Sequence, residues 1–404
     1  MWVLKVFGFV VLLASCAHTD AFIQVQLKKS LDDSWMIILK EAVAKAAHRF
    51  NSSLSTHLTP RFEEFKYLQH YTKIGIGDPE QTFDFTFNPI YRMVLVPSVA
   101  HKKKCGGTFK AYDEPSSHTY QDIHESFVSN EGFKLNAKVT EDTFHIGKLN
   151  VSDQSFGLIT EGPCRKSVYD GVIGLGFSKN HLTLLDNMSR LGTINSTIAG
   201  LYLDKDVRTT LGGEVALGDW NRKLVKNHDL IDFIPIVNTQ IPAWQIHIPM
   251  SFIGETQISF DRYAILDTTS YFIDVPAYEA EIIAKEIQAW NYDGNLIVDC
   301  DRTGILPNIT LVINQRNYTL QAKDYVDHVN NYKGSCIVLI RSTKDKVWTL
   351  GGAFLGNFYT IFHYETKKLA FAELLPKNQG NIAQITFWLI SSLSIFGFLQ
   401  LIKW

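Results

Sequence analysis

The sequence is poor in cysteine and has no strong excess of charge of either sign. Its 404 residues include five cysteines, and 39 basic against 41 acidic residues give a formal net charge of −2. This balance leaves no basic surface of the kind that binds nucleic acid, so we expect no nucleic-acid partner. The sequence has neither a paired Cys-x-x-Cys motif nor a glycine-rich phosphate loop. It therefore predicts no metal site and no cofactor.

Long hydrophobic runs are confined to the two ends of the chain. Near the start, Lys5 precedes an apolar run from Val6 to Ala14, and the small residues Ser15 and Ala17 follow it. This pattern predicts a signal peptide over residues 1–17. An uncleaved anchor helix is the alternative, although the run is short for a membrane span.

The second apolar run extends from Ile385 to Ile402. As a helix it would be about 27 Å long, just enough to cross the hydrocarbon core of a bilayer. Lys403 and Trp404 follow where residues that anchor in the headgroup region are expected. We predict a transmembrane helix over residues 385–402. A removed GPI signal and a buried core helix remain alternatives.

The cysteines and glycosylation sequons agree with entry into the secretory pathway. Loss of Cys16 with the signal peptide leaves an even number of cysteines, which suggests two disulfides with three possible connectivities. Two buried pairs of free thiols are the alternative. The four cysteines are Cys105, Cys164, Cys300 and Cys336. Six Asn-x-Ser/Thr sequons predict N-glycosylation at Asn51, Asn150, Asn187, Asn195, Asn308 and Asn317. We therefore predict a membrane-anchored glycoprotein with its body in the lumen or outside the cell.

Residues 18–66 separate the signal peptide from the main body and are predicted to form a prosegment-like region. It begins with the strand-like sequence FIQVQLKK. Apolar residues then recur at helical spacing, at Trp35, Ile38, Leu39, Val43 and Ala46. Two interpretations remain open, a segment that covers a cleft and a helix packed permanently on the body.

From Tyr71 to about Leu375 the sequence consists of short β-type runs separated by frequent turns. Few helices are expected, one around Thr183 to Met188 and one from Tyr278 to Ala289, after the turn residue Pro276. Many strands and few helices predict an all-β fold. The strand-turn sequences FDFTFNPI and YAILDTTS are followed later by VIGLG and TLGG, respectively. This repetition suggests an internal duplication.

Together these segments resemble the pepsin family of aspartic endopeptidases. YTKIGIGDPEQTFDFTFNPIYRMVLVPS resembles the family's opening strands, YAILDTTS resembles its second catalytic loop, and WTLGGAFLGNFYTIFHYETKKLAFAEL resembles its closing strands. The resemblance implies a bilobal fold with a cleft between two pseudo-twofold-related lobes. The N-terminal lobe is then expected over residues 67–236 and the C-terminal lobe over residues 237–376.

In this family two Asp-Thr-Gly loops meet between the lobes, and their carboxylates share one proton so that the pair supplies both a base and an acid. The resemblance identifies Asp267 as the retained half of this dyad, with Thr268, Thr269 and Ser270 following it in its loop. A single carboxylate in such a loop is more often structural than catalytic. Thr269 stands where the family has glycine, which puts the shape of the loop in doubt.

The first loop departs from the family at all three motif positions. Asn88 replaces the catalytic aspartate, and its amide can neither titrate nor act as a base. Pro89 replaces the threonine whose hydroxyl links the two loops, and it has no backbone N–H. Ile90 replaces a glycine. Asp84 lies four residues upstream in a strand, about 13 Å along the chain, which is too far to substitute for the missing acid.

The resemblance also carries expectations about the flap, the disulfides and the prosegment. Phe127 is the candidate for the aromatic residue of the flap, and a core phenylalanine is the alternative. A second-lobe bridge of the family implies that Cys300 pairs with Cys336, which leaves Cys105 and Cys164 to each other. The family's prosegment places a basic residue against the catalytic carboxylates, and the candidates for this role are Lys28 and Lys29.

Three functions are compatible with these observations. The leading hypothesis is a non-catalytic pepsin-like pseudoprotease that binds extended peptides in its cleft through backbone contacts. The second is an active aspartic endopeptidase with an atypical site. The third is a structural or adhesive membrane glycoprotein whose cleft is filled by its own N-terminal segment. Resemblance of fold cannot decide among them, because chemistry belongs to the site.

Overall fold

The computed structural model describes ten stretches of the chain: residues 22–32, 67–107, 109–129, 134–164, 168–178, 181–206, 211–237, 243–292, 295–332 and 334–376. The predicted signal peptide, the predicted helix after residue 33 and the apolar run at 385–402 lie outside these residues. Within the described stretches, no helix is both long enough and apolar enough to cross a membrane.

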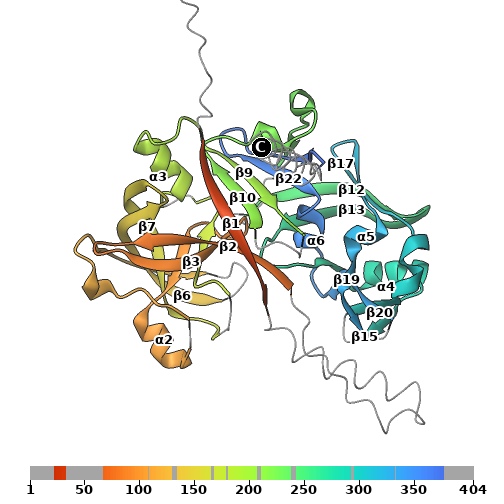
Figure 1. Ribbon diagram of the computed structural model, residues 1–404, viewed down its shortest axis with the longest axis horizontal. Helices are drawn as coiled ribbons and strands as arrows, with labels where there is room; N and C mark the ends of the chain where they lie inside the picture. Colours follow the sequence, from red (N-terminus) through yellow and green to blue (C-terminus); the bar gives the residue numbers. More distant parts are fainter. Residues whose placement is uncertain are drawn as a thin grey trace, which may run out of the picture.

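Strands dominate the structure and form two sheets (Figure 1). The thirteen-stranded sheet has the order β11-β23-β22-β9-β10-β1-β2-β3-β8-β4-β7-β6-β5. Its members, in chain order, are β1 (Ile23–Asp32), β2 (Tyr67–Ile76), β3 (Gln81–Asn88), β4 (Val94–Pro97), β5 (Gln121–Ser129), β6 (Leu135–Ile146), β7 (Leu149–Glu161), β8 (Gly171–Gly174), β9 (Ile198–Leu203), β10 (Leu211–Leu217), β11 (Ile234–Pro235), β22 (Phe358–His363) and β23 (Lys368–Glu373).

The ten-stranded sheet has the order β15-β16-β20-β14-β21-β13-β12-β17-β18, and β19 pairs with β20 beside this path. Its members are β12 (Gln245–Ile253), β13 (Thr256–Leu266), β14 (Ile273–Pro276), β15 (Trp290–Tyr292), β16 (Asn295–Asp299), β17 (Ile309–Ile313), β18 (Arg316–Leu320), β19 (Val326–Tyr332), β20 (Ser335–Thr343) and β21 (Trp348–Leu350). The predominance of strands, the two sheets and the two-lobed arrangement confirm the predicted all-β bilobal fold.

Helices in the described residues are short. They are α2 (Val99–Cys105), α3 (Leu184–Arg190), α4 (Ala277–Glu286), α5 (Ala322–Tyr325) and α6 (Gly352–Leu355), with 3-10 turns η1 (Glu114–Ser116), η2 (Arg222–Leu224), η3 (His228–Leu230) and η4 (Cys300–Ile305). Both predicted helices are confirmed. Thr183 begins α3 with a reciprocal hydrogen-bonded cap to Asp186, and α4 follows Pro276, which cannot donate a backbone hydrogen bond.

The two lobes repeat one arrangement of four strands. In the first lobe, β3 and β8 are parallel, β8 and β4 antiparallel, and β4 and β7 parallel. In the second lobe, β13, β21, β14 and β20 pair in the same order and with the same directions. The repetition agrees with the internal duplication suggested by the sequence. It also places the two candidate loops, after β3 and after β13, at equivalent positions.

The strand-like start of the prosegment-like region forms β1, which lies between β10 and β2 and pairs with both in antiparallel fashion. Figure 1 shows β1 and β2 passing between the two lobes. The closing strands β22 and β23 join the same sheet through β9, although they lie within the predicted C-terminal lobe. The sheet between the lobes is therefore built from both ends of the described chain.

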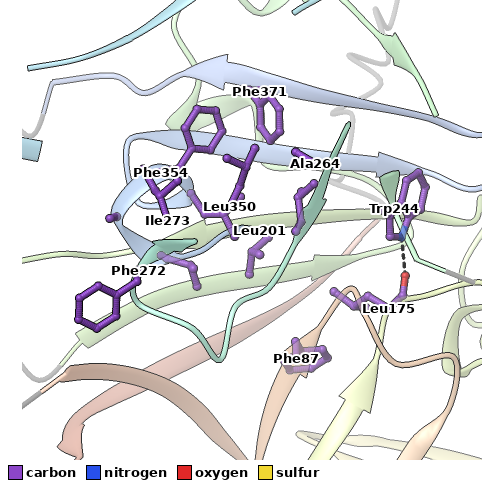
Figure 2. Close-up of a cluster of buried hydrophobic side chains, with 14 of the residues drawn as sticks. Phe87, Leu175, Leu201, Trp244, Ala264, Phe272, Ile273, Leu350, Phe354 and Phe371 are labelled. Atoms are coloured by element: carbon purple, nitrogen blue, oxygen red, sulfur yellow. Dashed lines mark hydrogen bonds between the residues drawn. The ribbon is translucent and has the colours of Figure 1, made fainter. Parts of the chain in front are cut away.

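A buried apolar core includes side chains from both lobes and from the sheet that β1 joins (Figure 2). Trp244 is fully buried, and its indole N–H donates to the carbonyl of Leu175 at 2.6 Å. Phe87, Leu350 and Phe354 belong to the same cluster. Burial of one such side chain contributes roughly 1.5–3 kcal/mol to the free energy of folding. The core therefore stabilises the strands from which both loops extend.

The structure forms both predicted disulfides, Cys105–Cys164 and Cys300–Cys336.

The predicted glycosylation sites do not all remain available. Asn187 is 0% exposed, and its side-chain amide donates to the carbonyls of Ser152 and Asp153. A folded chain has no room for a glycan there, so the prediction for Asn187 is wrong. Asn51 lies outside the described residues, and the remaining sequons are exposed at Asn150, Asn195, Asn308 and Asn317.

Candidate functional site

The candidate site lies where the first lobe meets the second. Asn88 is the last residue of β3, and its carbonyl accepts a hydrogen bond from the Leu175 N–H at 2.9 Å. Asp267 directly follows β13, and its own N–H donates to the carbonyl of Leu350 at 3.1 Å. Each loop is thus tied to the strand that runs parallel to it, so the backbone fixes both side chains in position.

The Asn88 side chain connects the two loops. Its Nδ2 donates to Asp267 Oδ1 at 2.8 Å and to Thr269 Oγ1 at 3.2 Å, while its Oδ1 accepts from the Ile90 N–H at 2.9 Å. Asn88 is 0% exposed, whereas its partners Asp267 and Thr269 are partly buried. Because an amide donor faces the carboxylate, the pair is held together without sharing a proton.

One oxygen of Asp267 accepts three hydrogen bonds. Besides the Asn88 amide, the Thr269 N–H reaches Asp267 Oδ1 at 2.9 Å and the Thr269 hydroxyl reaches it at 2.7 Å. Hydrogen bonds to an ionised acceptor are about twice as strong as those between neutral groups. The network therefore fixes the orientation of the carboxylate and occupies the oxygen that faces Asn88.

Thr269 plays a part that the sequence did not reveal. From the sequence alone, Thr269 is only a departure from the family's glycine. In the structure its hydroxyl donates to Asp267 and accepts from Asn88, so it bridges the two altered positions. The sequence did contain one signal for this role. Directly after Asp267 and Thr268 it has a side chain that can both donate and accept a hydrogen bond.

In the family, a threonine hydroxyl from each loop links it to the other loop. Here only the hydroxyl of the second loop is present. The Thr268 hydroxyl donates to the carbonyl of Phe87, across the interface between the lobes. Its counterpart position is Pro89, which has no hydroxyl to return the bond. The backbone of Ser270 helps to hold the second loop, because its carbonyl accepts a hydrogen bond from the Gly352 N–H at 2.8 Å. The loops therefore remain joined, but the joint is asymmetric.

The altered first loop has become part of an apolar cluster. Ile90 is buried together with Tyr91 and Met93, and Phe127 packs against the same cluster from β5. A side chain on Gly157 would meet the Phe127 ring at 2.9 Å, so this ring lies close to the backbone of β7. Phe127 is thus placed beside the candidate loop, in a packing role. Residues 130–133, beyond the end of β5, lie outside the described part of the chain.

The predicted contact between the prosegment lysines and the site is wrong. Lys29 is buried, and its Nζ lies 3.0 Å from the carbonyl oxygen of Asp204 and 3.6 Å from its carboxylate. Lys28 faces the opposite side of β1 and is exposed. Sequence reasoning missed Asp204 because the two residues meet only when β1 pairs with β10 and β10 pairs with β9, the strand that Asp204 directly follows. Asp84 is likewise engaged elsewhere, with Lys73 at 2.9 Å.

The described residues contain no group of three or more histidine, cysteine, aspartate or glutamate side chains arranged to hold a metal ion. The site itself offers one carboxylate, one amide and two threonine hydroxyls. This set can orient a polar group through hydrogen bonds. It holds a single titratable acid, so the proton exchange of a two-acid pair cannot take place within it.

Comparisons with known proteins place this geometry in context. A family model described as eukaryotic aspartyl protease matches residues 69–374. Renin-2 of Mus musculus is 28% identical over 349 residues, which cover 80% of this chain and 84% of the relative. Cathepsin D of Gallus gallus is 28% identical over 325 residues, 76% of this chain and 80% of the relative. Cathepsin D of Chionodraco hamatus is 26% identical over 407 residues, 92% of this chain and 100% of the relative.

Proposed function

Because the chain belongs to the eukaryotic aspartyl protease family, we propose that it is a catalytically inactive member that binds extended peptides between its lobes. One observation carries the proposal. Asn88 occupies the position of one acid and donates its amide to Asp267 at 2.8 Å. The two-lobed fold is retained, but at the site a hydrogen bond between an amide and a carboxylate stands in place of two acids that share a proton.

The missing acid matters because peptide hydrolysis by this family needs two different proton transfers. One carboxylate takes a proton from the attacking water, and the other donates a proton to the scissile carbonyl oxygen. Asn88 can do neither, since an amide does not titrate in the accessible pH range. Asp267 alone cannot be base and acid at the same time, so water activation and protonation of the carbonyl are uncoupled.

The same features that argue against catalysis are compatible with binding. Both loops are rigid, since each is bonded to its neighbouring parallel strand. Asp267 and Thr269 are only partly buried, so polar groups remain available at the site. Peptides bind to such sites mainly through main-chain hydrogen bonds, which do not require a catalytic pair.

Peptide binding is tested with fluorescently labelled fragments of a reduced, alkylated casein, followed by fluorescence anisotropy. We expect the native protein to bind them and Thr269→Trp, which fills the space beside Asp267, to weaken binding about tenfold or more, equivalent to about 1.4 kcal/mol. Leu230→Trp is the matched control, because Leu230 is exposed in η3, away from both loops. Absence of binding by the native protein, or equal binding by both variants, would contradict the proposal.

We also propose that the protein follows the secretory pathway and is held on a membrane by its C-terminal apolar run. The signal-like N-terminus, the exposed sequons and the two disulfides support an oxidising, glycosylating compartment. Deleting Ile385 to Trp404 is expected to move the protein from the membrane fraction of expressing cells into the medium. Release of the full-length protein by a phosphatidylinositol-specific phospholipase would instead identify a lipid anchor, and retention of the truncated protein on membranes would refute the anchor.

A further inference from the structure

Four strands of the second sheet align one row of side chains. Across β13, β12, β17 and β18, the antiparallel register places Phe260 opposite Met250, Met250 opposite Val312, and Val312 opposite Asn317. Residues directly opposite each other in antiparallel strands point to the same face of the sheet. Phe260, Met250, Val312 and Asn317 therefore form a continuous line, here called the outer row. Figure 1 shows β12, β13 and β17 side by side.

The outer row is apolar and faces solvent. Phe260 is 67% exposed and Met250 is 36% exposed, and Val312 is partly exposed. The alternate residues of β17 and β18, among them Leu311 and Tyr318, are buried on the other face. These neighbouring apolar side chains form a contiguous exposed patch, and such a patch often marks a place where something contacts the surface.

The row ends at a glycosylation sequon whose acceptor is accessible. Asn317 and Thr319 are both exposed and lie on the same face, because they are two residues apart on β18. The Thr319 hydroxyl is 3.0 Å from the hydroxyl of Thr310, which belongs to the sequon of Asn308. The acceptor side chain of another exposed sequon, Asn150, is already engaged, because its Oδ1 lies 2.9 Å from His145 Nδ1.

We propose that Asn317 carries an N-linked glycan whose first sugars lie across the outer row and shield it from water. In the modification, the Asn317 amide nitrogen forms a bond to the anomeric carbon of a lipid-linked oligosaccharide pyrophosphate. The lipid pyrophosphate leaves, and the amide loses one proton. This inference depends on secretory export of the chain and is independent of the fate of the catalytic pair.

The geometry of the sheet makes the shield possible. From β18 to β13 the row crosses three strand spacings, about 14 Å, a span that a core of several sugars can cover. Sugar rings have an apolar face that can pack on Met250 and Phe260 while their hydroxyls remain hydrated. Covering these side chains removes apolar area from water, which is favourable at roughly 25 cal/mol per Å².

Met250 provides a direct reporter, because hydrogen peroxide oxidises accessible methionine to the sulfoxide. The full chain is produced in eukaryotic secretory cells, and sulfoxide formation at Met250 is followed by peptide mass spectrometry. We expect Asn317→Gln to accelerate oxidation of Met250 several-fold. The buried Met93 and Met188 serve as internal references for an intact fold. Asn195→Gln, which removes an exposed sequon outside this sheet, is the matched control and should leave the rate unchanged.

Trimming the glycans of the native protein with an endoglycosidase gives a second measurement that needs no substitution, and it should also accelerate Met250 oxidation. An unmodified Asn317 in the glycopeptide map would overturn the proposal. Equal oxidation rates in native and Asn317→Gln protein would overturn it as well. So would acceleration by Asn308→Gln alone, since the neighbouring glycan would then be the cover.

Discussion

Rebuilding Asp-Thr-Gly at positions 88 to 90, together with Thr269→Gly, is expected to give the protein acid protease activity above that of the native chain. The four changes restore the second acid, the hydroxyl that links the loops and the glycines that let backbone approach a substrate. General acid–base assistance by such a pair is worth roughly 10²- to 10⁴-fold in rate. The gain is measured as cleavage of a denatured protein substrate at acid pH.

Asn88→Asp alone should restore little. It would place a second carboxylate 2.8 Å from Asp267 Oδ1, close enough for the two acids to share a proton. Pro89 would still lack the linking hydroxyl, and Ile90 would still occupy the place of a glycine. The single variant thus separates the loss of the acid from the loss of the loop.

The stability of the rebuilt variant must be measured, because one of its substitutions removes a buried side chain. Ile90 packs in a buried cluster, so replacing it with glycine should cost about 2–5 kcal/mol of unfolding free energy. Thermal unfolding of all variants identifies those that are folded at the assay temperature. Adding Asp267→Ala to the rebuilt protein should abolish its cleavage, as should a statine-type inhibitor. If the rebuilt protein is folded but inactive, residues outside the two loops also prevent catalysis.

His70 should make the protein less stable in acid. This histidine lies on β2 opposite Lys29 on β1, is 5% exposed, and places its Nε2 3.1 Å from the carbonyl oxygen of Asp204. Burial, reinforced by the charge of Lys29, lowers the pKa of His70 to about 4, although the Asp204 carbonyl and carboxylate act in the opposite direction. The neutral ring, with Nε2–H donating to the carbonyl, is therefore the form that the fold accepts.

The sign of the pH dependence follows from this depressed pKa. Between the unfolded value of 6.5 and the folded value of about 4, the unfolded chain binds one more proton than the folded chain. Folding stability from this group is complete above pH 6.5 and is lost as the pH falls toward 4. The difference corresponds to about 3 kcal/mol at most.

Denaturant unfolding of the native protein and of His70→Gln, at neutral pH and at about pH 4.5, measures this effect because carboxylate contributions are common to both. His70→Gln should lose markedly less stability on acidification. His228→Gln, at an exposed histidine in η3, is the control and should behave as the native protein does. Parallel losses in native and His70→Gln protein would mean that His70 does not report on the packing of β1 against β2.

The all-β class could be predicted from local strand patterns, and the bilobal fold from the resemblance to the pepsin family. The strand-turn patterns around Asn88 and Asp267, and the later glycine sequences, specify the same four-strand arrangement twice. The short helix α3 could be predicted for the same reason, since its cap lies within a few residues of its start. The presence of Asn88 where the resemblance implies an acid could also be read from the sequence, because it is a difference of residue type beside recognisable motifs.

The remaining features depend on contacts between distant segments. The bridging role of Thr269 requires knowing that Asn88 lies within hydrogen-bond distance. The burial of Asn187 depends on α3 packing near the start of β7, where carbonyl groups accept from its amide. The partner of Lys29 depends on the pairing of β1 with β10 and of β10 with β9, the strand that Asp204 directly follows. A sequence motif identifies such residues, but only the tertiary fold determines what they contact.

The most direct test of the account compares acid proteolysis by the native protein and by Asp267→Ala. Both purified proteins are incubated with a denatured protein substrate over the acid pH range, and new peptide ends are counted. The single titratable acid at the site predicts that the two proteins give the same background rate. Cleavage by the native protein that is lost in Asp267→Ala, and blocked by a statine-type inhibitor, would contradict the assignment of this chain as an inactive aspartyl protease.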